Sequence, residues 1–150
     1  MGSTTAAGTG LAISAALPTA QTEAAYKTLT FTEVGGVDQI GTFGASTEVV
    51  TFTPLKGAVQ KRKGPTNYGA LNPSMALDDA DAGQQLLSTA SAPTNNAEYA
   101  VRVTKPDGSL RFFQALVFGM PENIGAANAM IMANPVLEIN TPIVKAPASV

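Results

Sequence analysis

The stretch around which the chain is organised is Asn96-Ala-Glu-Tyr-Ala-Val-Arg-Val-Thr-Lys-Pro-Asp-Gly-Ser-Leu-Arg-Phe-Phe-Gln-Ala-Leu-Val-Phe118. Along 99–104, the large apolar residues Tyr99, Val101 and Val103 alternate with small or polar residues, and a second alternating run covers 110–118. Alternation of this kind is the two-residue period of a β-strand. Between the two runs, the ring of Pro106 fixes its backbone φ at a value that suits a turn, and Asp107-Gly108 supplies the positive φ that a hairpin turn needs. The sequence therefore predicts a long β-hairpin.

Two earlier strands are predicted over 26–33 and 47–55, and both carry threonine on one face. The threonines concerned are Thr28, Thr30, Thr32, Thr47, Thr51 and Thr53. Threonine favours strands, and its hydroxyl is readily solvated. The shared face fits either a solvated outer surface or the polar, weakly charged wall of a water-filled channel.

The segment 56–77 is rich in glycine and proline and is too long for a simple turn. Loops of this length in compact domains are usually functional or disordered. We expect an extended, partly β excursion that docks on another chain. The candidate inter-subunit residues are the basic Lys61, Arg62 and Lys63 and the apolar Tyr68, Leu71 and Met75.

One helix is predicted over 78–91, capped by Asp78. Asp78, Asp79 and Asp81 are favourably placed against the positive end of the helix dipole. The cluster also has the opening spacing of a calcium loop, but the glutamate that such a loop needs at position 90 is Ala90. An acidic helix start explains the cluster, and we expect no metal site.

The two ends of the chain are predicted to lie outside the main domain. Residues 1–25 are rich in small residues and fit either an arm that orders on a neighbouring subunit or a frayed terminus, with a short extended segment possible over 11–16. Closing strands are predicted over 124–133 and 136–143. The expected division is an N-terminal arm of 1–25, a β domain of 26–143 and a C-terminal tail of 144–150.

Composition narrows the possible functions. Charged residues make up 13% of the 150 residues, with a net charge of −2, whereas about a quarter charged is usual. A surface of this kind is often hidden in contacts with other subunits. The chain has no cysteine and no histidine, which excludes thiolate or imidazole metal sites, cysteine nucleophiles and serine–histidine pairs. We find no catalytic constellation and expect neither enzymatic activity nor a cofactor.

The sequence also lacks the marks of a membrane or secreted protein. No stretch approaches the ~20 apolar residues that span a bilayer. The apolar run 11–17 is not preceded by the basic residues of a secretory signal. We therefore expect a soluble protein of the cytoplasm without membrane contact.

The order of these parts resembles the tail tube (major tail) proteins of long-tailed bacteriophages. The resemblance covers roughly 26–143 and rests on two strands, a long basic segment, an acid-capped helix, the hairpin at 99–118 and closing strands. It implies a mainly β fold: a β-sandwich or barrel-like domain with one flanking helix and extended arms. Six copies would pair edge to edge into a ring with a continuous inner β-barrel, and the rings would stack into a hollow tube.

The resemblance implies a role as well. The protein would be made in the host cytoplasm and would become part of the virion tail, where the threonine-rich face lines the channel and DNA passes without being recognised. The tube would enclose a tape-measure protein and contact tail terminator and tip proteins. Two other classes stay open. One is a head-decoration or tail-terminator subunit that forms closed oligomers, and the other is a small β-barrel binding module or hydrolase that is a stable monomer.

Overall fold

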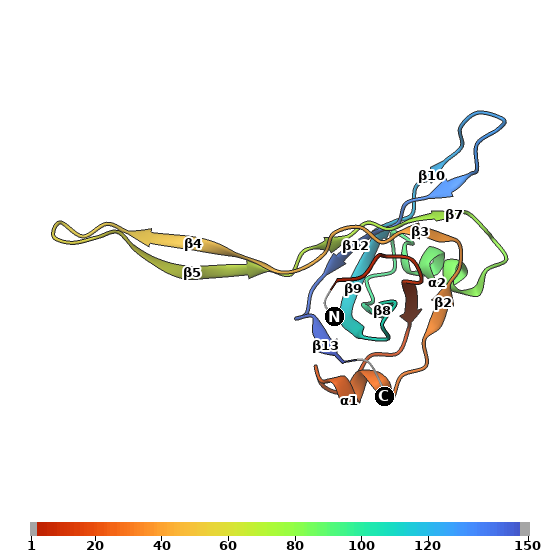
Figure 1. Ribbon diagram of the computed structural model, residues 1–150. Helices are drawn as coiled ribbons and strands as arrows, with labels where there is room; N and C mark the ends of the chain where they lie inside the picture. The colour runs from red at the N-terminus through yellow and green to blue at the C-terminus, as the bar shows by residue number, and fades with distance from the viewer. Residues whose placement is uncertain (1–2, 148–150) are drawn as a thin grey trace.

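Two antiparallel sheets enclose the core of the protein in the computed structural model, which describes residues 3–147 (Figure 1). The strands of the large sheet are β1 (Gly10–Ser14), β2 (Thr32–Val34), β6 (Ala70–Leu71), β8 (Tyr99–Thr104), β9 (Leu110–Gly119), β12 (Val136–Ile139) and β13 (Val144–Ala146). Their order is β2-β1-β8-β9-β12-β6, and β13 also pairs with β9. The smaller sheet has the order β10-β11-β7-β3, with bounds Glu122–Asn123, Met132–Ala133, Ser74–Ala76 and Val37–Gln39.

The remaining elements are two helices and a separate pair of strands. The helices are α1 (Glu23–Lys27) and α2 (Ala82–Ala90), and the pair is β4 (Ser46–Phe52) with β5 (Gln60–Asn67). Within residues 3–147, strand residues make up 40% and helical residues 10%. The expected mainly β fold is therefore confirmed, although two helices replace the single one predicted.

The hairpin predicted within 96–118 is confirmed as β8 and β9, and β8 pairs along its whole length with residues 110–115 of β9 in antiparallel register. Gly108 has a φ of 94°, and its N–H donates to the Lys105 carbonyl at 2.9 Å. Glycine takes such a φ at no steric cost. The turn chemistry of the sequence thus fixes the register of the central strands.

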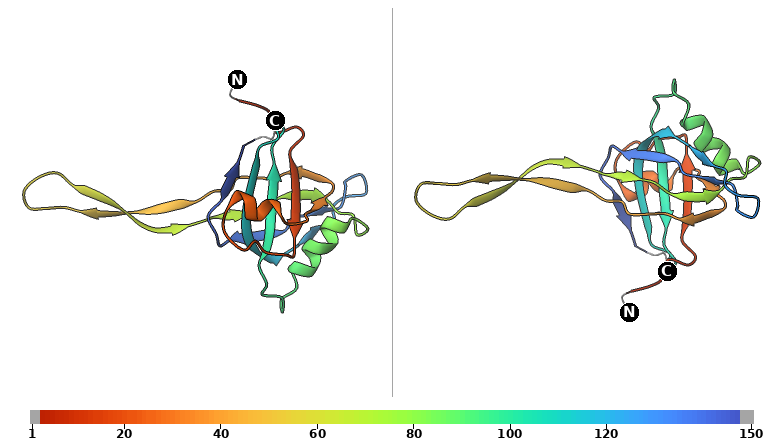
Figure 2. Two further views of the ribbon diagram at one scale, coloured as in Figure 1. Left: turned by 90° about the horizontal axis from the view of Figure 1, so that it is seen from below. Right: turned by 90° about the horizontal axis from the view of Figure 1, so that it is seen from above.

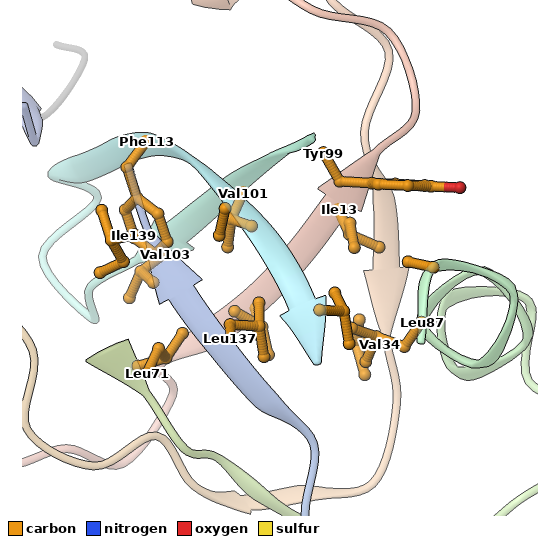
Figure 3. Close-up of a cluster of buried hydrophobic side chains, with 14 of the residues drawn as sticks. Ile13, Val34, Leu71, Leu87, Tyr99, Val101, Val103, Phe113, Leu137 and Ile139 are labelled. Carbon is orange, nitrogen blue, oxygen red and sulfur yellow. The ribbon is translucent and has the colours of Figure 1, made fainter. Parts of the chain in front are cut away.

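The main core lies between one face of the large sheet, the smaller sheet and α2 (Figure 3). Val101 and Val103 of β8 and Phe113 of β9 point into it from alternate positions, and all are buried. The labelled side chains that join them are Ile13, Val34, Leu71, Leu87, Tyr99, Leu137 and Ile139. The chain passes from the large sheet to the smaller one between β2 and β3 and again between β6 and β7. The two sheets therefore form a barrel-like sandwich.

The opposite face of the large sheet is covered in part by α1 (Figure 2). The Tyr26 ring stacks on Phe112, with centroids 5.1 Å apart and an interplanar angle of 12°. The Tyr26 hydroxyl donates to Gln21 Oε1 at 2.8 Å. Burial raises the pKa of Tyr26 above its ordinary value. This contact makes a second, smaller core beneath α1.

The N-terminal segment is part of the sheet rather than an arm outside it. β1 lies between β2 and β8, and Leu11, Ala12 and Ile13 are buried. The short alternation within 11–16 therefore belongs to a central strand, and the boundary expected at residue 26 does not separate an arm from the core. Residues 1 and 2 of the expected arm lie outside the described residues.

The strand predicted over 26–33 is wrong for most of its length. Residues 23–27 form α1 because the Thr22 hydroxyl accepts a hydrogen bond from the Ala25 N–H at 3.2 Å, a helix N-cap. Glu23 and Lys27 add an ion pair at 2.8 Å across one helical turn. Only the last part of the predicted strand is extended, as β2.

The helix predicted over 78–91 is confirmed as α2, but its cap is Asp81 rather than Asp78. The Asp81 carboxylate accepts from the Gln84 N–H and from the Gly35 N–H, each at 3.0 Å. One side chain therefore caps α2 and ties it to the connection between β2 and β3.

The C-terminal part differs from expectation in two places. The strand predicted over 124–133 is limited to β11, because 124–131 form an exposed connection from β10. The strand predicted over 136–143 is confirmed in its first half as β12. The predicted tail joins the sheet through β13, which pairs with β9, and its residues 148–150 lie outside the described part of the chain.

Gly83 allows α2 to lie directly on β2. A Cβ at this position would come 2.2 Å from the Glu33 carbonyl oxygen and 2.6 Å from the Val34 Cα, both backbone atoms. Alanine favours a helix over glycine by about 1 kcal/mol, but this clash would push the helix off the core. We expect Gly83→Ala to lower the free energy of unfolding by about 1–3 kcal/mol in urea denaturation. Ser88→Ala, on the exposed side of α2, is the matched control, and a stabilised Gly83→Ala variant would contradict the clash.

Candidate assembly surfaces

The most unusual surface is the ribbon, the two-stranded hairpin of residues 46–67 formed by β4 and β5. It extends away from the body of the molecule (Figures 1 and 2). Every residue of β4 is exposed, and on β5 only Gly64 is half-buried. A lone two-stranded hairpin is at best marginally stable in water. A ribbon of this kind gains stability by packing on another surface.

The expected long loop is thus mostly strand. The strand predicted over 47–55 is confirmed as β4, whereas 56–77 contains β5, β6 and β7. The register shifts between Thr47 and Val49, so that Gly64 and Pro65 both lie opposite Glu48. A bulge tolerates proline because no ladder hydrogen bond is required there. Glycine and proline, which indicated a loop, mark the bulge instead.

The two faces of the ribbon differ in character. Residues that pair directly across two strands point to the same face. Lys61 pairs with Thr51 and Lys63 with Val49, and these four residues make up what we call the basic face. The opposite face carries Val50, Phe52, Gln60 and Arg62. Exposed apolar side chains therefore stand on both faces, and Leu55 is fully exposed at the tip.

The ribbon and the body carry opposite charge. The ribbon holds four of the nine Lys and Arg residues and one of the eleven Asp and Glu residues, a net charge of +3. The rest of the chain holds the other five basic and ten acidic residues, a net charge of −5. The small net charge of the whole chain is therefore the sum of two regions of opposite charge.

The six predicted inter-subunit residues separate into two groups. Lys61, Arg62 and Lys63 are exposed on β5, as docking requires. Leu71 and Met75 are 0% exposed within the chain's own core, so their expected role as contacts to another subunit is wrong. Tyr68 is half-buried and packs against the same core. Val49, Val50 and Phe52 were not among the predicted contact residues. The feature that could have identified them is that they are apolar residues in a strand flanked by polar residues.

The six predicted channel residues do not share one strand face. Thr28 is the C-cap of α1, Thr30 follows it in the connection to β2, and Thr32 begins β2. The other three lie on or just beyond β4, and the Thr47 hydroxyl hydrogen-bonds the Thr66 hydroxyl at 3.0 Å. The structure brings Thr47, Thr51 and Thr53 together on the ribbon and leaves the first three near α1. A channel lining by any of them stays a prediction.

A second protrusion stands at the hairpin of β10 and β11 (Figure 1). Ile124 and Met130 are each 70% exposed, and Phe118 at the end of β9 is 66% exposed. These side chains were not singled out from the sequence, because their segment was predicted to be a strand. The hairpin of β10 and β11 stands on the side of the body away from the ribbon (Figure 1).

Two grooves lie on the surface of the described part of the chain. One, of about 740 Å³, lies between residues 3–9, the segment 37–43 and the turn at 105–107, where hydrogen bonds from Ser109 lower the pKa of the Asp107 carboxyl. The other, of about 360 Å³, lies between α2 and β10. Within residues 3–147, no group of three or more acidic side chains is arranged to hold a metal ion. Neither helix of that range is long and apolar enough to cross a membrane.

Three of the solved structures that share this fold are the following. A chain of the anti-feeding prophage baseplate matches with a TM-score of 0.70 and 11% identity, over 99% of both chains. A chain from the sheath/tube terminator structure of the PVC extracellular contractile injection system matches with a TM-score of 0.65 and 8% identity, over 91% of this chain and 93% of that one. A chain from the C6-symmetric tail of an empty GTA particle matches with a TM-score of 0.59 and 13% identity, over 75% and 84%.

At these identities the likeness establishes the fold alone. A comparison with protein-family models finds no match, and a search of curated proteins finds none either.

Proposed function

We propose that this protein is a structural subunit of a phage-tail-like or contractile-injection particle, and that its copies form stacked hexameric rings of a tail tube. The observation that carries the proposal is the ribbon, an exposed element whose net charge is opposite to that of the barrel-like body. The three fold neighbours support the setting, since they come from structures of a baseplate, a sheath/tube terminator and a tail, two of them with six-fold symmetry.

In this role the protein is a building element and not a catalyst. The rings would form by pairing of sheet edges, a tendency of exposed strands, and the ribbon would join neighbouring copies. In a phage the tube would conduct DNA without recognising it, enclose a tape-measure protein and contact terminator and tip proteins. A polar, nearly uncharged bore suits passage, because a basic wall would bind phosphates.

A tube terminator or baseplate subunit is the second candidate, favoured by the length over which the chain matches the baseplate and sheath/tube terminator structures. Such a subunit closes or caps a tube and does not extend it. The two roles therefore differ in whether purified protein elongates.

The test is electron microscopy of the purified protein over a range of concentrations, with light scattering in parallel. We expect hollow filaments with a regular axial repeat above a critical concentration. Discrete rings that never stack would favour the terminator or baseplate role. A monomer at every concentration would contradict self-assembly, and with it the proposed function.

A further inference from the structure

We propose that the basic face of the ribbon docks into the groove between α2 and β10 of a second copy of the chain. This inference rests on the proposed function and adds the surface that receives the ribbon.

The receiving groove is polar and acidic. Asp79 contributes a carboxylate from the segment before α2, and Glu122 contributes one from β10. Gln85, Ser88 and Thr89 of α2 add side chains that form hydrogen bonds, and Met120 adds an apolar surface. Both carboxylates are exposed, and neither forms an ion pair within residues 3–147.

The basic face of the ribbon complements this lining. Lys61 and Lys63 are exposed and form no ion pair within the described residues. They are spaced by two residues on one strand, about 6–7 Å apart along it. Val49 and Thr51 stand beside them and match the methionine and the hydroxyls of the groove. The opposite net charges of ribbon and body favour this encounter over contact between two ribbons.

The placement of the two surfaces makes the contact head-to-tail. The ribbon leaves one side of the body, whereas α2 and β10 lie on the other side, as both views show (Figures 1 and 2). A contact between two different surfaces leaves a free ribbon at one end and a free groove at the other. Repetition of such a contact gives either a closed ring or an open filament.

The absence of cysteine from the chain allows a direct test. A Lys61→Cys and Glu122→Cys double variant, purified reduced, would be allowed to assemble and then oxidised. We expect a ladder of covalent multimers on a non-reducing gel that collapses to monomer with reductant. The matched control pairs Glu122→Cys with Lys145→Cys, which is exposed on β13 and should give no ladder. Dimers from Lys61→Cys alone, as strong as those from the pair, would show ribbon-to-ribbon contact and overturn the inference.

Charge reversal provides a second measurement. Lys61→Glu with Lys63→Glu should raise the critical concentration for assembly about tenfold, since like charges would face each other across the contact. Adding Asp79→Lys and Glu122→Lys to the same chain should restore assembly. If wild-type protein assembles and neither reversal nor rescue has an effect, the groove is not the receiving surface while the proposed function stands. If wild-type protein never assembles, the proposed function itself fails.

Discussion

Replacing the ribbon with a short Asn-Gly turn is expected to leave a folded domain that forms no filaments at any concentration. Ser46 and Asn67 lie directly opposite each other in the register, so residues 47–66 can be replaced by a turn that favours a hairpin. None of the replaced residues is buried. The melting temperature measured by circular dichroism should therefore stay close to that of the wild type, while filaments disappear from micrographs.

The shortened protein also offers an internal control. It keeps the groove between α2 and β10 but has no ribbon, so added to wild-type protein in small amounts it should occupy growing ends and shorten the filaments. Shortening the exposed connection 124–131 in the same way tests whether loss of any protrusion is enough. Filaments of normal length from the protein without its ribbon would show that assembly uses the body alone.

The parts of the fold that could be predicted from sequence are those determined by residues close to one another along the chain. The hairpin at 99–118 follows from alternation and the glycine in its turn, and α2 follows from the acidic residues at its start. α1 was missed because the N-cap at Thr22 and the Glu23–Lys27 pair are short signals. The stacking of Tyr26 on Phe112, a residue distant in sequence, holds the helix in place.

The parts that could not be predicted depend on pairing between distant segments. β1 contains only Leu11 and Ile13 as large apolar residues, and it is buried because β2 and β8 flank it. The ribbon and the body strands carry similar sequence patterns, yet the ribbon strands are exposed along nearly their whole length. Among the candidate site residues, Lys61 and Lys63 could be proposed from their charge, whereas the acidic groove could not, because Asp79 and Glu122 are distant in sequence and line one groove only in the fold.

Leu71 shows how an apolar residue can be assigned to the wrong partner. Its apolar side chain predicts burial, whereas the glycines and prolines around it predict a loop, and together these signals favour burial against another chain. In the structure β6 pairs with β12 at the edge of the large sheet, and Leu71 is 0% exposed. Leu55, in contrast, is fully exposed at the tip of the ribbon.

The two leucines therefore form a matched pair for the last prediction. Leu71→Ala should lower the free energy of unfolding of the monomer by about 2–5 kcal/mol, because it leaves a cavity in the core. Leu55→Ala should change that free energy by less than about 0.5 kcal/mol and instead raise the critical concentration for assembly. Urea denaturation below the assembly threshold measures the first effect, and light scattering measures the second.

The chemical change is the same at both positions, so differences in the result report the surroundings alone. Equal destabilisation by both variants would mean that the ribbon packs on its own body in solution, and the docking proposal would lose its basis. A Leu71→Ala protein of normal stability that fails to assemble would return Leu71 to the interface. The expected pattern, in which one variant loses stability and the other loses assembly, separates the residues that make the fold from those that join its copies.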